Sequence, residues 1–260
     1  MQNYWSRQTA DKPLFPDLLW SRPENRTHAG KLLVIGGNAY GFAAPALAFT
    51  EASKAGIGST HVLLPEHVQK LLPKGFFAAD FAPSTPSGSF AKNALSEMLA
   101  HAQWADGVLL AGDLGRNSET AIALEQFSQK YSGQLTITQD AADYFINNPA
   151  TVLQRPETTL VISFAQLRRL GIQAKFAKAF TFDMDFFPLI EALHDFTEAH
   201  GITLVTKHND RIFVAHRGEV SDTKLDADMP VWRVHTAAHV ATWQAQNPSK
   251  PFEASTTAIL

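Results

Sequence analysis

The sequence contains no cysteine among its 260 residues, and this absence excludes disulfide bonds, thiolate nucleophiles and thiolate metal sites. It also has no block of five or more like charges. The 22 lysines and arginines are balanced by 25 acidic residues, for a formal net charge of −3. The sequence therefore has no cluster of basic residues of the kind that binds nucleic acid, and we expect no nucleic acid partner.

Long apolar runs are missing as well. No uninterrupted apolar stretch approaches the roughly 20 residues that a membrane-spanning helix needs. The N-terminal segment MQNYWSRQTADK has no apolar core of the kind found in secretory leaders. We therefore expect no membrane partner and a cytoplasmic location. Hydrophobic residues nevertheless make up 45% of the chain, which is enough for a sizeable core.

The sequence does contain an alternation of apolar runs and helical patterns. Continuous apolar runs predict buried strands at residues 31–35, 59–65, 106–112, 134–138, 158–163, 201–207 and 211–217. Periodic segments predict helices at 42–55, 65–73, 92–102, 120–131, 186–200, 231–246 and 251–260. The segment PDLLWSRPENRTHAG predicts a short helix followed by a surface lead-in to the first strand. This alternation predicts a three-layer α/β/α sandwich around a mainly parallel sheet. We expect one domain over residues 1–260, with residues 1–30 as a surface lead-in.

In an open parallel sheet, ligands bind beyond the carboxyl ends of the strands, so the turns after the strands are the candidate site. The first of these turns holds Gly36, Gly37, Asn38 and Tyr40 and leads into an alanine-rich helix. Its spacing fits neither a dinucleotide-binding fingerprint nor a P-loop. Two interpretations remain open: a bare backbone that approaches a ligand at a helix N-terminus, or only a tight strand-to-helix turn.

Three later turns carry glycines or charged groups. Gly112 to Gly115 close another apolar strand, with the same two interpretations as the first turn. Asp140 follows the next strand, where it is either a ligand-facing carboxylate or a helix cap. Lys207 ends a further strand, where it either neutralises a phosphate or is merely solvated. Asn117 or Ser118 is the expected N-cap of the helix at 120–131.

Ten histidines raise the question of a protein-held metal ion. His235 and His239 are four residues apart on a predicted helix, which places both imidazoles on one face. The sequence offers no third ligand near them and no HExxH pattern, so we predict no metal site. A Ser-His-Asp hydrolase is also disfavoured, because no strand is followed by a GxSxG turn.

Residues 36–66, GGNAYGFAAPALAFTEASKAGIGSTHVLLPE, resemble the GGS…Y…GAPxLAAxAAxxAGAG segment of the ribokinase-like ADP- or ATP-dependent NAD(P)H-hydrate dehydratases, which repair hydrated nicotinamide cofactors. The segments AGDLG, TQDAADYF and TLVTKHNDRIFVAHRGEV are similar to that family's PGLG turn, DADAL segment and KGxxxxIxxxxG strand pair. The resemblance implies a ribokinase-like fold. It also implies a homo-oligomer assembled through the region of the alanine-rich helix.

By the same resemblance, the ligand is an NAD(P)H-type dinucleotide, and the nucleotide is ADP or ATP with Mg²⁺ if the protein is active. The resemblance implies a dinucleotide pocket lined by Gly36, Gly37, Asn38, Tyr40 and Ala44 and bordered by Gly112, Gly115 and Asp140. It places Lys207 against the phosphates of ADP or ATP.

The family's GTGD turn, which forms an anion hole and carries the catalytic aspartate, has no counterpart in this sequence. Residues 237–255 resemble the helix after that turn, and this alignment places Val231, Trp232, Arg233 and Val234 where GTGD belongs. A lost base costs roughly 10² to 10⁴ in rate, and a lost anion-hole donor about 10² to 10³. Asp226 and Asp228 lie a few residues upstream as candidate replacements.

Other departures lie in neighbouring turns. Ser163 ends a segment that replaces the family's TPH motif, His208 replaces the glycine after the phosphate-facing lysine, and Asp113 places an acid where a phosphorylated ligand would prefer none. Two functions therefore remain open. One is an NAD(P)H-hydrate dehydratase with a replaced base, and the other is a non-catalytic relative that binds a nucleotide-like ligand or another subunit.

Overall fold

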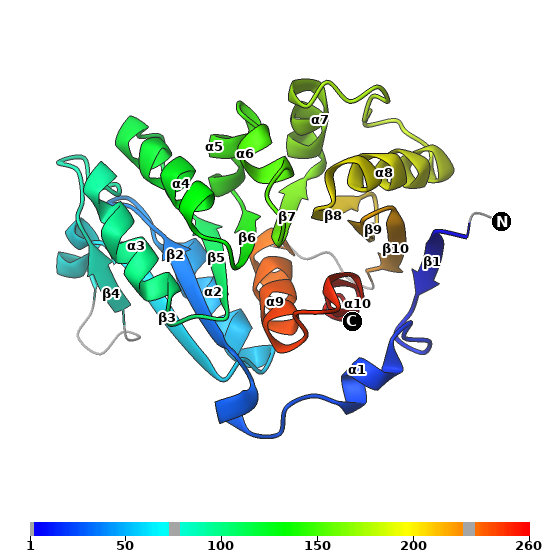
Figure 1. Cartoon of the computed structure of the whole chain (residues 1–260), viewed down its shortest axis with the longest axis horizontal. Coiled ribbons are helices and arrows are strands. Elements are labelled where there is room, and N and C mark those ends of the chain that lie inside the picture. The colour runs from blue at the N-terminus through cyan, green and yellow to red at the C-terminus, as the bar shows by residue number, and fades with distance from the viewer. Residues whose placement is uncertain (1–2, 73–78, 226–231) are drawn as a thin grey trace.

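The computed structural model describes residues 3–72, 79–225 and 232–260, and these residues contain a ten-stranded sheet in the order β1-β10-β9-β8-β7-β6-β5-β2-β3-β4 (Figure 1). Only β9 runs antiparallel to its neighbours among these strands, so the sheet is mainly parallel, as predicted. The strands are β1 (Trp5–Gln8), β2 (Lys31–Gly36), β3 (Ser59–Pro65), β4 (Ala79–Ala82), β5 (Gly107–Gly112), β6 (Gln134–Thr138), β7 (Thr158–Ser163), β8 (Thr203–His208), β9 (Arg211–His216) and β10 (Glu219–Lys224).

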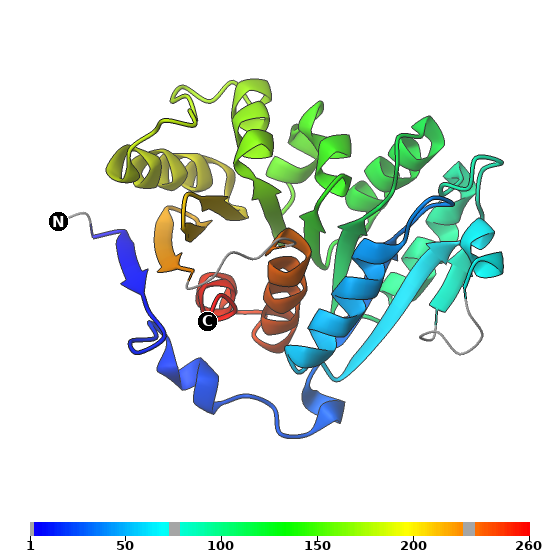
Figure 2. The same cartoon turned by 180° about the vertical axis from the view of Figure 1, so that it is seen from behind.

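Helices cover both faces of the sheet, and this confirms the predicted three-layer α/β/α sandwich (Figure 1 and Figure 2). One face is covered by α3 (Leu95–Ala102), α4 (Ser118–Lys130), α5 (Ala141–Ile146), α6 (Ala150–Leu153), α7 (Phe164–Gln173) and α8 (Phe186–His200). The other face is covered by α1 (Pro16–Trp20), α2 (Ala43–Lys54), α9 (Trp232–Gln246) and α10 (Pro251–Thr257). Short 3₁₀ helices are η1 (Arg26–His28), η2 (Glu66–Lys70) and η3 (Lys92–Ala94).

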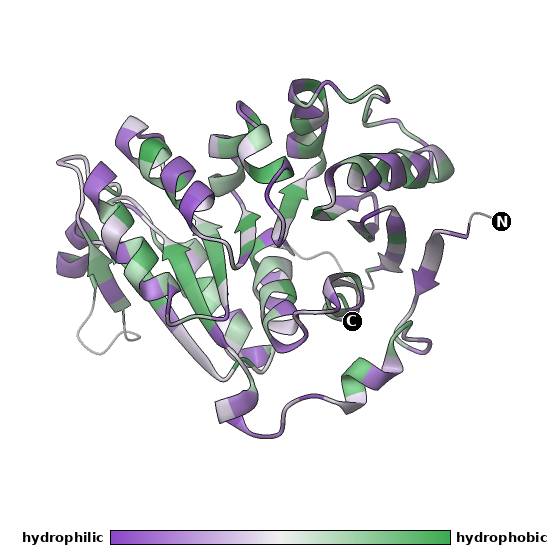
Figure 3. Ribbon diagram, in the orientation of Figure 1, coloured by the Kyte–Doolittle hydropathy of each residue, from purple (hydrophilic) through white to green (hydrophobic). Residues whose placement is uncertain are grey.

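The central strands are apolar because both of their faces are buried. In β2, Leu33 and Ile35 lie in the core under α3 and α4, whereas Leu32 and Val34 lie in the core under α2 and α9. All four side chains are fully buried. Burial of each stabilises the fold by about 1.5–3 kcal/mol. Figure 3 shows the same pattern as an apolar centre, with polar residues on the outer helices.

Small side chains allow α2 and α9 to pack closely against each other and the sheet. Ala48 and Ala52 of α2 and Ala237, Ala238 and Ala241 of α9 are buried in one core. The alanines of α2 therefore have a packing role within this chain. The predicted helix at 42–55 is confirmed, and Gly56 follows it with φ of +89°, a conformation that suits glycine at a helix C-terminus.

Three strands were missed by the apolar-run criterion: β1, β4 and β10. The polar strand β10 carries Asp222, which is fully buried, and its carboxylate accepts hydrogen bonds from Trp5 and from Arg211. β1 pairs in parallel with β10, so describing residues 5–8 as a surface lead-in was wrong. A strand of this composition is stabilised by partners far away in the sequence, which no local pattern reveals.

Helix boundaries needed smaller corrections. The helix predicted at 65–73 is the 3₁₀ helix η2, and the last helix ends at Thr257, before the predicted end at residue 260. Asn117 is the N-cap of α4, and its side chain accepts from the N–H groups of Glu119 and Thr120. Among the described residues, no helix is both long and apolar enough to cross a bilayer.

Candidate functional site

The glycines at the ends of β2 and β5 bring two backbones into contact. The N–H of Gly37 donates to the carbonyl oxygen of Gly112 at 3.0 Å, and a Cβ on Gly36 would lie 2.5 Å from that oxygen. Gly37 has φ of +86°, and a Cβ there would lie 3.1 Å from Leu64. The tight-turn interpretation therefore accounts for these glycines without a ligand. Their contact with a ligand stays a prediction.

Asn38 holds the first turn to the β5 turn. Its Nδ2 donates to the carbonyl oxygen of Asp113 at 2.6 Å, and its Oδ1 accepts from the N–H of Tyr40 at 2.7 Å. Asn38 is buried, whereas Tyr40 is 93% exposed. The turn thus fixes its own backbone through Asn38 and leaves the Tyr40 ring in solvent, where it can stack on a planar ligand.

Asp113 occupies the N-terminus of the alanine-rich helix. Its Oδ2 accepts a hydrogen bond from the backbone N–H of Ala44 at 2.7 Å, and Phe42, the N-cap residue of α2, makes no side-chain cap of its own. A carboxylate is favoured there by the helix dipole. The anion position that a ligand phosphate would use at this N-terminus is therefore taken by the protein itself.

Asp140 lies in the turn after β6 and faces the turn that follows β5. Its Oδ2 accepts hydrogen bonds from the N–H groups of Leu114 and Gly115, both at 3.0 Å. Although Asp140 is the N-cap residue of α5, it makes no side-chain cap there, so the helix-cap interpretation is wrong. Its buried Oδ1 has no hydrogen-bond partner in the described part of the chain. Burial, and secondarily the charge of Asp113, raise the pKa of Asp140, while the two amides oppose this shift.

Tyr144, which the sequence gave no reason to select, fixes the far end of the β5 turn. Its hydroxyl donates to the carbonyl oxygen of Gly115 at 2.8 Å and accepts from the N–H of Asn117 at 3.2 Å. Together with Asp140, it holds the turn that follows β5 in one conformation. The only sequence signal for this role was its position four residues after Asp140.

At the start of α9, Arg233 takes part in a polar network. Its Nη1 donates to Oε1 of Gln166 at 2.9 Å, and Gln166 forms a capping box with Ser163 at the start of α7. Ser163 pairs in register with Lys207 of β8. Arg233 and Lys207 therefore approach the same end of β7, and Arg233 was not selected by the sequence argument. The nucleotide contact of Lys207 stays a prediction.

Aromatic side chains lie beside this network. His208 is buried, its ring centroid is 4.4 Å from that of Phe164, and its Nε2 is 3.2 Å from the carbonyl oxygen of Met184. Trp232 packs against the core formed with α2. His208 and Trp232 thus both have packing partners within the protein.

The residues present fit the implied ADP or ATP with Mg²⁺ only in part. Lys207 and Arg233 are cations that can neutralise a phosphate. The first turn of α9, however, contains no acidic residue, and its described residues begin with Trp232 and Arg233, neither of which is a glycine. Val231, Asp226 and Asp228 lie outside the described residues. The described part of this site has no anion hole at α9, and we derive no reaction step through the nucleotide.

A cavity of about 590 Å³ lies at the amino ends of the central strands, whereas these turns lie at their carboxyl ends. It is lined by residues at the amino ends of the central strands, including Gln134, Thr159 and Thr203, and by Gln244 of α9. This cavity contains none of the residues that the sequence selected.

Comparison with known proteins defines the fold. No family model matches the sequence, and no curated protein matches it either. A ribokinase-like superfamily protein from Enterococcus faecalis V583 is similar over 100% of this chain and 87% of its own, with 17% identity and a TM-score of 0.73. The ADP/ATP-dependent NAD(P)H-hydrate dehydratase from Bacillus subtilis, co-crystallised with ATP and Mg²⁺, is similar over 91% of this chain and 79% of its own, with 11% identity and a TM-score of 0.60.

The pyridoxal kinase from Staphylococcus aureus is a third similar structure, over 88% of this chain and 85% of its own, with 10% identity and a TM-score of 0.57. These similarities confirm the ribokinase-like, carbohydrate-kinase-type fold that the sequence resemblance implied. At 10 to 17% identity they establish the fold alone.

Proposed function

We propose that this protein binds a nicotinamide dinucleotide, intact or hydrated, at the carboxyl ends of β2, β5 and β6, and that it transfers no phosphoryl group. The observation that carries the proposal is the carboxylate of Asp140. Its Oδ2 is held by the amides of Leu114 and Gly115, and its buried Oδ1 has no partner in the described structure. A buried acceptor without a partner costs about 1–3 kcal/mol, which a ligand hydroxyl would recover.

The surrounding groups suit the parts of such a ligand. Carboxylates at the ends of parallel strands bind ribose hydroxyls in dinucleotide-binding proteins. Tyr40 offers an exposed ring for stacking, in the turn that Asn38 ties to the β5 turn. Lys207 and Arg233 supply positive charge on the other side of β7, where a phosphate would be neutralised.

The same site gives little support for phosphoryl transfer. Phosphoryl transfer depends on donors and a base that are already in position around the moving group. Here the amides of Ala44, Leu114 and Gly115 are bound to Asp113 and Asp140, and the first turn of α9 has no carboxylate among its described residues. A protein with this arrangement is expected to bind without turnover.

Ligand-dependent thermal unfolding tests the binding proposal. NADH should raise the melting temperature more than ATP with Mg²⁺ does, and Asp140→Ala should abolish the NADH effect. Asp106→Asn is the matched control, because Asp106 also accepts from a backbone N–H, that of Lys31, but at the amino edge of the sheet. If neither NADH nor hydrated NADH shifts the wild-type protein, the binding proposal is wrong.

A second candidate function is an NAD(P)H-hydrate dehydratase in which Asp140 replaces the missing base. The raised pKa of Asp140 and its unpartnered oxygen favour this candidate, since a general base works best with a pKa nearer neutrality. Recovery of NADH absorbance from hydrated NADH with ADP or ATP and Mg²⁺ separates the two functions. Turnover by wild-type protein that Asp140→Asn abolishes would establish the dehydratase, and a flat trace would leave the binding function.

A further inference from the structure

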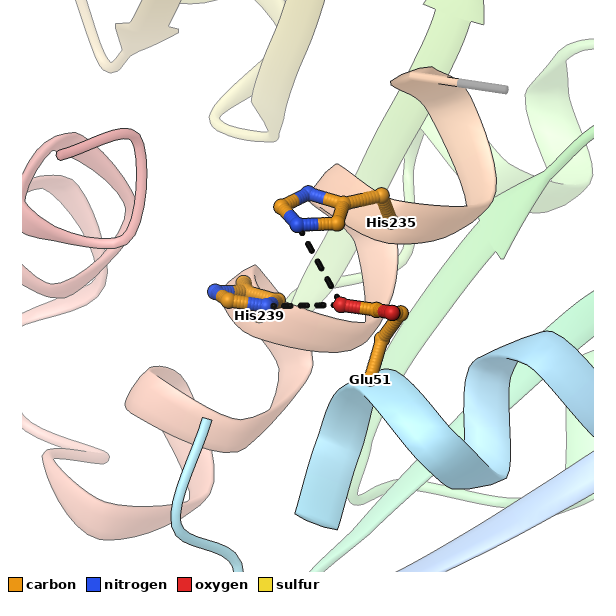
Figure 4. Close-up of side chains that lie close together, drawn as sticks. All are labelled: Glu51, His235 and His239. Carbon is orange, nitrogen blue, oxygen red and sulfur yellow. Dashed lines mark hydrogen bonds and ion pairs between the residues drawn. The ribbon is translucent and has the colours of Figure 1, made fainter. Parts of the chain in front are cut away.

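Two histidines of α9 and one glutamate of α2 converge between these helices, as Figure 4 shows. The rings of His235 and His239 are stacked, with centroids 4.2 Å apart and planes inclined by 21°. Their Nε2 atoms lie 3.2 and 3.4 Å from the same oxygen, Oε2 of Glu51. One donor atom from each residue lies within 4.8 Å of the other two.

The helix pairing creates this cluster. Spacing of four residues puts both imidazoles on the face of α9 that contacts α2, and the small side chains of both helices allow a close approach. The side chain of Glu51 is only 5% exposed, whereas those of His235 and His239 are 33% and 21% exposed. The carboxylate of Glu51 is therefore buried, and the two imidazoles are partly exposed to solvent.

The donor groups of the cluster suit a cation. Burial acts to raise the pKa of Glu51, but the hydrogen bond from Lys54 and the nearby histidines outweigh it and lower this pKa. Burial lowers the pKa of His235, and burial together with His235 lowers the pKa of His239 to about 4. The cluster contains one carboxylate and two imidazoles, and their donor atoms are close enough to share one ion.

The distances suit a shared ion as well as they suit hydrogen bonds. An N–H···O hydrogen bond is typically about 2.7–3.2 Å long, and the hydrogen bond between His239 and Glu51 is a long one at 3.4 Å. Zinc binds histidine nitrogen and carboxylate oxygen at about 2.0–2.2 Å, so two ligands of one tetrahedral ion lie about 3.3–3.6 Å apart. The observed separations of 3.2 and 3.4 Å are close to that range.

We propose that Glu51, His235 and His239 bind a Zn²⁺ ion that links α2 to α9. Two imidazole nitrogens and one carboxylate oxygen form a donor set that zinc uses with three protein ligands, and an open fourth position takes water. Lys54 donates to Oε1 of Glu51 at 2.7 Å, which orients the carboxylate so that Oε2 faces the histidines. The sequence prediction of no metal site rested on the histidine pair alone, because Glu51 could not be recognised as a third ligand from sequence.

A second cluster in the described structure serves as the comparison. The Nδ1 atoms of His61 and His101 lie 3.4 and 3.6 Å from Oδ2 of Asp80. The side chain of Asp80, however, is 44% exposed. His61 is stacked on Trp104, with ring centroids 3.9 Å apart. This cluster has no buried carboxylate to fix its geometry, so we expect it to bind zinc far more weakly.

Zinc titration of the full chain, freed of metal with EDTA and then of the chelator, tests the site. We expect one Zn²⁺ per chain and a melting temperature raised by about 4 °C or more at saturation. Glu51→Gln and His239→Asn should each weaken binding by at least about 100-fold and remove the thermal shift. His101→Asn should leave both measurements unchanged. Co²⁺ in place of Zn²⁺ should give the strong visible absorption of a tetrahedral site, which Glu51→Gln removes.

Three outcomes would overturn the proposal. The first is no zinc uptake by the wild-type chain at micromolar metal. The second is zinc binding that Glu51→Gln and His239→Asn leave intact, and the third is binding lost in His101→Asn instead. Glu51→Gln keeps the size of the side chain, and circular dichroism of each variant separates a lost ligand from a lost fold. None of these measurements depends on a nucleotide, so the result is independent of the proposed function.

Discussion

The carboxylate of Asp113 binds the backbone N–H of Ala44 at 2.7 Å, across two turns that belong to different strands. Asp113 thereby acts as the cap of α2, and it places a fixed negative charge where the N-terminus of that helix would attract a phosphate. This hydrogen bond therefore affects both the stability of α2 and the kind of ligand that can bind at its N-terminus. The same carboxylate that completes the helix also opposes a phosphorylated ligand at this position.

Asp113→Asn should strengthen binding of a phosphorylated ligand to this turn. Asparagine retains an oxygen acceptor for Ala44 but removes the charge. We expect roughly tenfold tighter binding of NADH or ATP, which corresponds to about 1.4 kcal/mol, with a loss of unfolding free energy below about 1 kcal/mol. Isothermal titration calorimetry measures the affinity. Asp106→Asn should leave it unchanged, and equal affinities of Asp113→Asn and wild type would show that no phosphate approaches α2.

Arg233→Gln should weaken the response to ATP. Arg233 bonds Gln166 near the end of β7, and its removal takes away a positive charge beside Lys207. We expect about a tenfold loss of ATP affinity, since one partly screened charge pair is worth about 1 kcal/mol or more. Arg169→Gln is the matched control, because the half-exposed Arg169 pairs with Asp143 nearby. A similar loss in both variants would point to a general charge effect.

Arg155→Lys should destabilise the fold. Arg155 is buried, and its guanidinium donates to the carbonyl oxygens of Tyr131, Gly133 and Glu157 and to Thr158. A lysine cannot reach all of these acceptors at once, so we expect a loss of about 2–4 kcal/mol of unfolding free energy in urea. The exposed Arg168, changed to lysine, should cost less than about 0.5 kcal/mol.

His216 should make the protein less stable in mild acid. Burial, and secondarily Arg217, lower the pKa of His216 to about 4, against about 6.5 in an unfolded chain. The unfolded state therefore binds more protons between these values. Stability from this group is fully present above pH 6.5 and decreases as the pH falls from 6.5 to 4, by roughly 3 kcal/mol in total.

Urea unfolding at pH 7.5 and pH 4.5 measures this dependence. His216→Asn should reduce the difference in unfolding free energy between the two pH values, whereas the exposed His28, changed to asparagine, should not. An unchanged difference in His216→Asn would show that other groups cause the acid sensitivity. The hydroxyl of Thr203 lies 2.9 Å from Nδ1 of His216 and loses this hydrogen bond in the variant. Because this loss lowers the unfolding free energy at both pH values, the comparison is made between pH 7.5 and pH 4.5 for each protein separately.

The layer architecture was predictable because the central strands are apolar on both faces. Leu32 to Ile35 in β2 lie between two cores, and such continuous runs are readable from sequence. The polar strand β10, which lies between β1 and β9, was not predictable from sequence, since its buried Asp222 depends on Trp5 and Arg211. Local patterns report burial by hydrophobic contact, and they do not report burial by ion pairs with distant residues.

The candidate site was predictable as a set of turns but not in its connections. Asp140 and the turn after β5 were both selected from sequence. Their hydrogen bonds, and the capping of α2 by Asp113, appeared only when the strand order placed β2, β5 and β6 side by side. The histidine pair of α9 was likewise visible, but Glu51 lies 184 residues before His235 and was not.

The sequence by itself determined the alternation of buried strands and helices, because side-chain polarity and glycine placement act over a few residues. Only the tertiary structure decided which carboxylates meet which amides and imidazoles, at Asp113, Asp140 and Glu51. Such contacts depend on the distance between groups that the chain separates by tens to hundreds of residues. That distance is set by strand order and helix packing, which no local pattern contains.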